Sequence, residues 1–174
     1  MTRMIILLRG INVSGRNKVP MAELRSALAD GGFEDVATYI QSGNIAVDTE
    51  LDEDALADEI ENLLVERFDV DVPAVPVAQH MIAEREAQAP FPSDADPAIH
   101  LIYFARGEVD VAGIQTIDPT KHLGDTITAT TSAVYVAYGQ GQSKSKLTVD
   151  QLEKAAGTVL TGRNLRSVAK LKNL

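Results

Sequence analysis

Hydrophobic and polar positions along the first thirty residues predict a buried strand followed by an amphipathic helix. Met4–Arg9 is an almost continuous apolar run, which is typical of a strand covered on both faces. After a polar loop over residues 10–19, Pro20 suits a first helical position. Met21, Leu24 and Leu28 then recur at helical spacing, and two glycines at 31 and 32 end the pattern.

The next fifty residues predict a hairpin, a second helix and an edge strand. Val36–Gln41 and Ile45–Asp48 alternate as strands do, and a tight turn at 42–44 joins them. The following helix has an apolar stripe made of Leu56, Ile60, Leu63, Leu64 and Phe68, with carboxylates on its opposite face. Two prolines confine the strand over 72–78 to an edge. This β-α-β-β-α-β order is the split βαβ arrangement of a ferredoxin-like unit.

A second, similar series is predicted for the rest of the chain. The expected elements are a short helix over 79–86, a strand over 100–104, a helix over 109–117, a hairpin of 125–130 with 133–138, a polar, flexible loop over 139–146 and two final helices. Thr148 with Gln151 forms a capping box for the first of these two helices, which Gly157 ends. The last helix is expected to begin near Thr161. We therefore predict an α+β fold of two ferredoxin-like subdomains, residues 1–78 and 79–174, with antiparallel or mixed sheets and helices on one face; the second subdomain ends in two helices.

Composition and charge narrow the class of protein. The 174 residues are 45% hydrophobic and 24% charged, which is typical of a soluble globular chain, and the absence of cysteine excludes disulfides and thiolate metal sites. No apolar run is long enough to span a bilayer, so we expect a cytoplasmic protein with no membrane partner. The net charge of −9 argues against binding to duplex nucleic acid, because that affinity depends on neutralising phosphates.

Most familiar catalytic and cofactor motifs are absent or incomplete. His80, His100 and His122 lie far apart without ligand spacing, so no metal site is expected. Ser143 and Lys146 have an S-x-x-K spacing, but a loop position is a poor place for such a nucleophile. The glycines at 139 and 141 lack the remainder of a dinucleotide or phosphate-binding loop. We therefore expect no cofactor.

Three polar segments carry most of the side chains suited to holding an anion. One runs from the end of the first strand to a helix start, one is the hairpin turn at 41–44, and the third combines 145–146, just before a predicted helix, with 163–164, in the first turn of another. Cations at a helix N-terminus oppose the helix dipole by roughly 0.3–1 kcal/mol unless an anion compensates. The candidate ligand-binding residues are Arg9, Asn12, Lys18, Gln41, Asn44, Lys146, Arg163 and Asn164.

Three functions remain open on these residues. The first is a module that binds a small phosphate-bearing anion in a basic cleft between the subdomains, where the cations neutralise charge and the amides fix orientation. The second is a hydrolase or transferase acting on a phosphorylated small molecule, which would have to recruit Glu34, Asp35 or Asp125 as a base. The third is a structural or protein-interaction domain in which the polar loops only lock the fold. The sequence does not decide whether the protein is an enzyme.

The same segments resemble the DUF1697 family, uncharacterised bacterial proteins with the SP0830-like fold. The matching stretches are Leu7–Val13, Asn17–Val19, Thr38–Asn44, Pro90–Pro92, Ser145–Leu147, Arg163-Asn164 and Lys170-Leu171. They are spread over essentially the whole chain, and the first and third are long enough to be specific. The resemblance implies an α+β fold of two ferredoxin-like subdomains, and it implies no particular activity.

Overall fold

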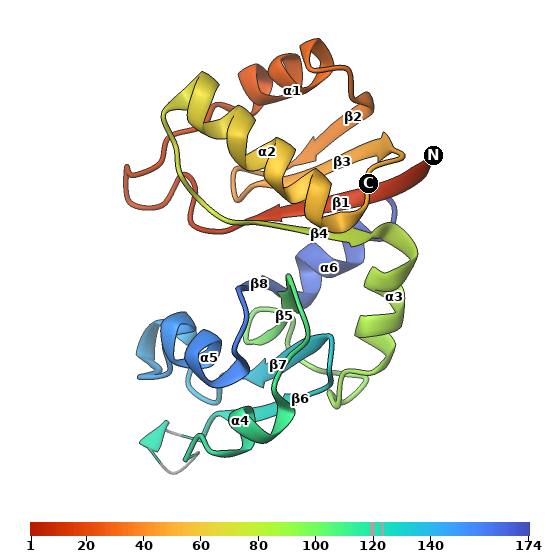
Figure 1. The fold of residues 1–174 in the computed structure, drawn as a ribbon. Coiled ribbons are helices and arrows are strands. Elements are labelled where there is room, and N and C mark those ends of the chain that lie inside the picture. The colour runs from red at the N-terminus through yellow and green to blue at the C-terminus, as the bar shows by residue number, and fades with distance from the viewer. Residues whose placement is uncertain (119–120, 123) are drawn as a thin grey trace. The chain divides into compact units, whose positions relative to one another are not determined.

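The protein divides into two compact units. The structure, a computed structural model, describes residues 1–118, 121–122 and 124–174 (Figure 1). The first unit consists of Met1–Ile82 with Lys170–Leu174, and the second consists of Ala83–Ala169. The predicted boundary at 78/79 thus lies four residues before this division. The last five residues join the first unit, in which Arg3 Nε and Nη2 each donate to the carbonyl oxygen of Leu174 at 3.2 Å.

The first unit has the predicted β-α-β-β-α-β order. Its elements are β1 (Thr2–Leu8), α1 (Met21–Asp30), β2 (Glu34–Tyr39), β3 (Asn44–Thr49), α2 (Glu53–Phe68) and β4 (Ala74–Ala78), followed by α3 (Gln79–Ala87), which contains the division between the units. The strands form an antiparallel sheet in the order β2-β3-β1-β4. The proline-containing β4 is therefore an edge strand, as predicted, and β1 is central.

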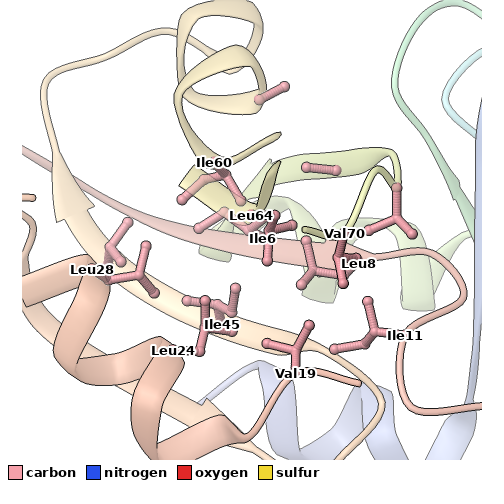
Figure 2. Close-up of a cluster of buried hydrophobic side chains, with 14 of the residues drawn as sticks. Ile6, Leu8, Ile11, Val19, Leu24, Leu28, Ile45, Ile60, Leu64 and Val70 are labelled. Atoms are coloured by element: carbon pink, nitrogen blue, oxygen red, sulfur yellow. The ribbon is translucent and has the colours of Figure 1, made fainter. Parts of the chain in front are cut away.

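One face of this sheet carries a hydrophobic core that also anchors the loop after β1. Leu24 and Leu28 of α1, with Ile60 and Leu64 of α2, pack against the side chains that β1 and β3 present to this face (Figure 2). Ile11 and Val19, at the two ends of the loop, point into the same cluster and are 2% and 0% exposed. The intervening β1 residues Ile5 and Leu7 are also fully buried, as expected for a strand covered on both faces.

The acidic helix α2 forms as its sequence predicts. Asp52 caps the N-terminus, because its side chain accepts a hydrogen bond from the backbone nitrogen of Ala55 at 2.8 Å. Asp69 ends the helix in the left-handed conformation, with φ of 54°. Within the described part of the chain, no helix is both long enough and apolar enough to cross a membrane.

The second unit repeats the same order. Its elements are β5 (His100–Ala105), α4 (Val111–Gln115), β6 (Thr126–Ala129), β7 (Ala133–Ala137), a 3₁₀ turn η2 (Gln142–Lys144), α5 (Val149–Ala156), β8 (Leu160–Asn164) and α6 (Leu165–Leu171), whose last two residues belong to the first unit. These strands form an antiparallel sheet in the order β6-β7-β5-β8. Both sheets are antiparallel, so the α+β fold of two ferredoxin-like subdomains is confirmed.

The predicted start of the last helix is wrong. Leu160–Asn164 forms the edge strand β8, paired antiparallel with β5, and α6 begins only at Leu165. The second unit therefore completes the β-α-β-β-α-β series, and it does not end in two successive helices. This strand was not predicted because it contains Gly162, and an isolated glycine lowers strand propensity. The structural reason for the glycine is that it lies directly opposite Tyr103 in the ladder.

The capping box predicted for α5 is confirmed. The Thr148 hydroxyl accepts from the backbone nitrogen of Gln151, and the Gln151 side chain accepts from the backbone nitrogen of Thr148. Gly157 ends the helix in the left-handed conformation. Leu147 and Leu152 on either side of the box are both buried in the core of the second unit.

Candidate functional site

The loop between β1 and α1 of the first unit has a defined conformation. Its tip is a small hairpin in which Val13 and Arg16 pair, with the Arg16 nitrogen donating to the Val13 carbonyl oxygen at 2.9 Å. Ser14 and Gly15 between them both have positive φ, as a type I′ turn requires. Together with the buried Ile11 and Val19, this hairpin gives the loop a defined shape without a helix or a long strand.

Asn12 fastens this loop to itself and to the neighbouring hairpin turn. Its Oδ1 accepts from the Val19 nitrogen at 2.9 Å, and its Nδ2 donates to the carbonyl oxygens of Val19 at 3.0 Å and Gln41 at 2.9 Å. Asn12 has φ of 53°, a conformation that asparagine tolerates better than most residues. Asn17 closes the loop further by donating to the Gly10 carbonyl oxygen at 2.9 Å. Two predicted ligand-binding residues, Asn12 and Gln41, are thus brought together.

The turn from β2 to β3 is equally constrained. Asn44 is fully buried, and its Nδ2 donates to the Tyr39 carbonyl oxygen and to the Ser42 hydroxyl, both at 3.0 Å. Gly43 has φ of 81°, and a Cβ there would lie 2.7 Å from Cβ of Leu8, so only glycine fits against the end of β1. The Asn44 amide is therefore part of the framework that shapes this turn.

Two cations of the loop, Arg16 and Lys18, have no carboxylate partner among the described residues. Arg16 and Lys18 are both exposed, and neither makes an ion pair within 4 Å with any residue that the structure describes. The segments 9–22 and 36–47 contain no aspartate or glutamate. Arg9, at the start of the loop, is half-buried, and its backbone nitrogen donates to the Pro73 carbonyl oxygen at 3.0 Å. The first unit therefore has a local positive surface although the whole chain is acidic.

The start of α1 follows Lys18 but adds no net positive charge, because Glu23 lies in its first turn. Pro20 is the N-cap, and it provides no side-chain hydrogen bond to the first turn. A helix N-terminus concentrates unsatisfied backbone N–H groups, and here the carboxylate of Glu23 in the same turn compensates them. We define the basic loop surface as Arg16, Lys18 and Gln41.

The other three predicted residues belong to the second unit. Asn164 is the N-cap of α6, since its Oδ1 accepts from the Ser167 nitrogen at 2.9 Å. Lys146 is exposed just after η2. Arg163 lies in β8 and not in a first helical turn, so the predicted conflict between its charge and a helix dipole is wrong. For all eight predicted residues, ligand contact stays a prediction.

Arg163 is a buried cation whose guanidinium is engaged by its own strand. Its side chain belongs to the buried polar set at 7% exposure, and its Nη1 donates to the Thr161 hydroxyl at 2.8 Å and to the Gly162 carbonyl oxygen at 2.9 Å. Burial lowers the pKa of Arg163 to about 10, because the charged form loses water. These contacts fix the side chain in place within the second unit.

Asp125 has a larger structural role than its sequence position suggested. It is 3% exposed, its Oδ1 accepts from the Gly139 nitrogen at 3.0 Å, and its Oδ2 accepts from the Ser145 hydroxyl at 2.5 Å. The Ser145 oxygen in turn accepts from the Leu147 nitrogen at 2.9 Å. The stretch 139–146, predicted to be a flexible polar loop, is thereby fastened at both ends.

A pair of buried tyrosines lies in the same unit and was not singled out in the sequence. The hydroxyl oxygens of Tyr103 and Tyr138 are 2.5 Å apart, and both side chains are 1% exposed. Burial raises the pKa of both hydroxyls, and for Tyr138 the neighbouring Tyr103 raises it further. In the sequence, these tyrosines appear only as aromatic residues within or directly after apolar strands. The hydrophobic core of any protein produces that pattern.

No metal centre is apparent among the residues that the structure describes. Within those residues, no group of three or more histidine and carboxylate side chains gathers closely enough to hold an ion. His100 contacts the Asp96 carbonyl oxygen through its Nδ1 at 2.8 Å, and its ring meets Phe91 edge-on at 4.7 Å. His100 therefore has a packing role in the second unit.

Comparison with known proteins agrees with the fold. The structure of the conserved bacterial protein SP0830 from Streptococcus pneumoniae matches with a TM-score of 0.74 and 23% identity, covering 98% of this chain and 97% of that chain. No curated protein matches. The family model for proteins of unknown function, DUF1697, matches residues 1–135. The resemblance seen in the motifs is confirmed, and the chain belongs to the DUF1697 family.

Proposed function

We propose that this protein is a binding module that takes a small phosphate-bearing anion at the basic loop surface of its first unit. The observation that carries the proposal is that Arg16 and Lys18 are exposed on a fastened loop, outside every ion pair made by the described residues. Phosphate oxygens accept several hydrogen bonds, so two cations beside an amide suit them.

The hydrogen bonds that fix the loop favour binding by these cations. A flexible loop would have to be ordered when the ligand binds, and that ordering lowers the affinity. Asn12 joins the backbone of Val19, next to Lys18, to the backbone of Gln41, so the two loops are already held together. A local cluster of cations also attracts an anion to an acidic protein, because nearby charges dominate the field at a surface.

Titration with inorganic phosphate followed by amide NMR tests this function. We expect saturable shifts confined to residues 16–22 and 40–42, and a rise of the thermal midpoint with phosphate concentration. Lys18→Ala and Arg16→Ala should each weaken binding at least fivefold. Lys154→Ala is the control, since Lys154 is an exposed cation on α5 of the second unit that makes no ion pair with the described residues.

Two results would contradict the proposal. One is the absence of saturable shifts at phosphate concentrations up to tens of millimolar. The other is an equal loss on Lys154→Ala and Lys18→Ala, which would mean that phosphate responds only to overall charge. The remaining predicted residues, Arg9, Asn44, Lys146, Arg163 and Asn164, are tested in the same experiment by whether their own amides shift.

A hydrolase or transferase acting on a phosphorylated substrate is the second candidate, and one contact favours it. The Asp125 carboxylate accepts from the Ser145 hydroxyl, which is the arrangement of a base beside a nucleophile. Release of phosphate from para-nitrophenyl phosphate, lost in both Ser145→Ala and Asp125→Asn, would support this function. Phosphate release that is unchanged in folded Ser145→Ala would remove this pair as its source.

A further inference from the structure

Two aliphatic side chains are exposed on the loops that carry the basic loop surface. Val13 is 57% exposed at the tip of the loop, paired with Arg16, and Ile40 is 50% exposed directly before Gln41. The hydrogen bond from Asn12 to the Gln41 carbonyl oxygen joins the two loops. Apolar and cationic groups are therefore presented together, on backbone that is already fixed.

The backbone of Ile40 makes this exposure more informative. Ile40 has φ of 51°, in the left-handed region that β-branched residues rarely adopt. Its neighbours hold it there, because Asn44 binds the Tyr39 carbonyl oxygen and Gly43 packs on Leu8 and Ile11. A strained residue whose side chain is half in water contributes little to folding, and such strain is concentrated at functional sites.

Resting on the proposed function, we infer that the anion is a phosphate monoester with a flat apolar body, the chemistry of a mononucleotide. The phosphate is held by Arg16 and Lys18, and the body lies over Val13 and Ile40. The base of a mononucleotide is planar and hydrophobic on its faces, and covering two exposed aliphatic side chains removes apolar surface from water on both partners. Inorganic phosphate alone would leave Val13 and Ile40 uncovered.

Methyl NMR on the full chain, labelled at isoleucine and valine, tests this inference with four probes. Inorganic phosphate and ribose 5-phosphate should shift the Lys18 amide and leave the Ile40 and Val13 methyl groups in place. AMP should shift the Lys18 amide and move both methyl signals upfield through the ring current of the base. We expect AMP to bind at least tenfold more tightly than ribose 5-phosphate, and adenosine to bind more weakly than either.

Substitution of Ile40 separates the role of the apolar body from that of the phosphate. Ile40→Asn replaces the aliphatic group by a residue that adopts positive φ readily, so the variant should fold with a urea midpoint at or above that of the parent. It should bind AMP no more tightly than ribose 5-phosphate, with phosphate affinity unchanged. Val65→Ser is the matched control, because Val65 is a 47% exposed aliphatic residue on α2 rather than on either loop, and it should change neither affinity.

The outcomes distinguish this inference from the function on which it rests. Saturable phosphate binding at Lys18, with AMP and ribose 5-phosphate equal in affinity, would contradict the inference that the ligand has an apolar body. It would still support the anion site. Tight AMP binding that survives Ile40→Asn would overturn the placement on Ile40. No binding by any phosphate probe would overturn both.

Discussion

Gly162 in β8 lies directly opposite Tyr103 in β5, and a Cβ on Gly162 would come within 2.6 Å of Cε1 of the tyrosine ring. The ring therefore lies against the bare backbone of the neighbouring strand. This close approach explains why the strand contains a glycine, which otherwise weakens a strand by its conformational freedom. It also sets the position of the Tyr103 hydroxyl, which meets the hydroxyl of Tyr138 at 2.5 Å.

The contact between Gly162 and Tyr103 shows why the prediction from the sequence failed at β8. Elements that depend only on neighbouring residues were predicted correctly. Strong periodic signals, such as the apolar run of β1 and the capping box of Thr148, depend on neighbours in sequence and were predicted correctly. The strand β8 depends on the ring of Tyr103, 59 residues before Gly162 in the chain, which supplies the reason for its glycine. No local pattern contains that information.

The candidate site shows the same contrast between features that neighbouring residues predict and features that depend on the fold. The sequence identified polar loops after β1 and β2, and these loops do meet through Asn12 and the Gln41 carbonyl oxygen. It did not show that Asn12 and Asn44 would bind backbone groups, because an amide in a loop suits a ligand and a carbonyl oxygen equally well. Only the folded positions of Val19, Gln41 and Tyr39 reveal which groups the amides bind.

Enlarging Gly162 should destabilise the protein. In Gly162→Ala the new methyl group overlaps the Tyr103 ring, so the ring or the strand must shift, and we expect a loss of about 1–3 kcal/mol. Urea unfolding followed by circular dichroism measures it. In a Tyr103→Leu background the same substitution should lose less free energy, since the flat ring is absent. Equal losses in both backgrounds would show that the strain has another source.

Removing one hydroxyl of the tyrosine pair should be more harmful than its size suggests. Tyr138→Phe leaves the buried Tyr103 hydroxyl without its closest partner, and we expect a loss of about 1–3 kcal/mol in the free energy of unfolding. The double variant Tyr103→Phe and Tyr138→Phe should lose less than the sum of the two single variants, because no orphaned hydroxyl remains. Strict additivity in a double-mutant cycle would contradict a coupled pair.

The same pair should make the protein sensitive to alkali. Burial raises the pKa of both tyrosines above 10, their value in the unfolded chain, so the folded state keeps protons that the unfolded state releases. The stabilisation is complete below pH 10 and is lost as the pH rises above it, by about 1.4 kcal/mol per pH unit for each tyrosine.

Comparing variants isolates this effect from the buried Arg163, which titrates in the same range. The difference in unfolding free energy between the parent and Tyr138→Phe should shrink by about 1.4 kcal/mol between pH 9 and pH 11. Arg163 is present in both proteins and cancels. A difference that stays constant over this range would mean that the Tyr138 hydroxyl has its ordinary pKa in the folded protein, and a difference that grows would mean that folding lowers this pKa.

Asn12 should control the rigidity of the basic loop surface. Asn12→Gly keeps a backbone that accepts φ of 53° but removes three hydrogen bonds, to the Val19 nitrogen and to the carbonyl oxygens of Val19 and Gln41. We expect a loss of about 1–3 kcal/mol, together with faster hydrogen exchange at the Val19 amide and in residues 10–19. Asn12→Ala should lose about 1 kcal/mol more, because alanine resists positive φ. Unchanged exchange at Val19 in Asn12→Gly would show that the buried Ile11 and Val19 side chains hold the loop without the amide.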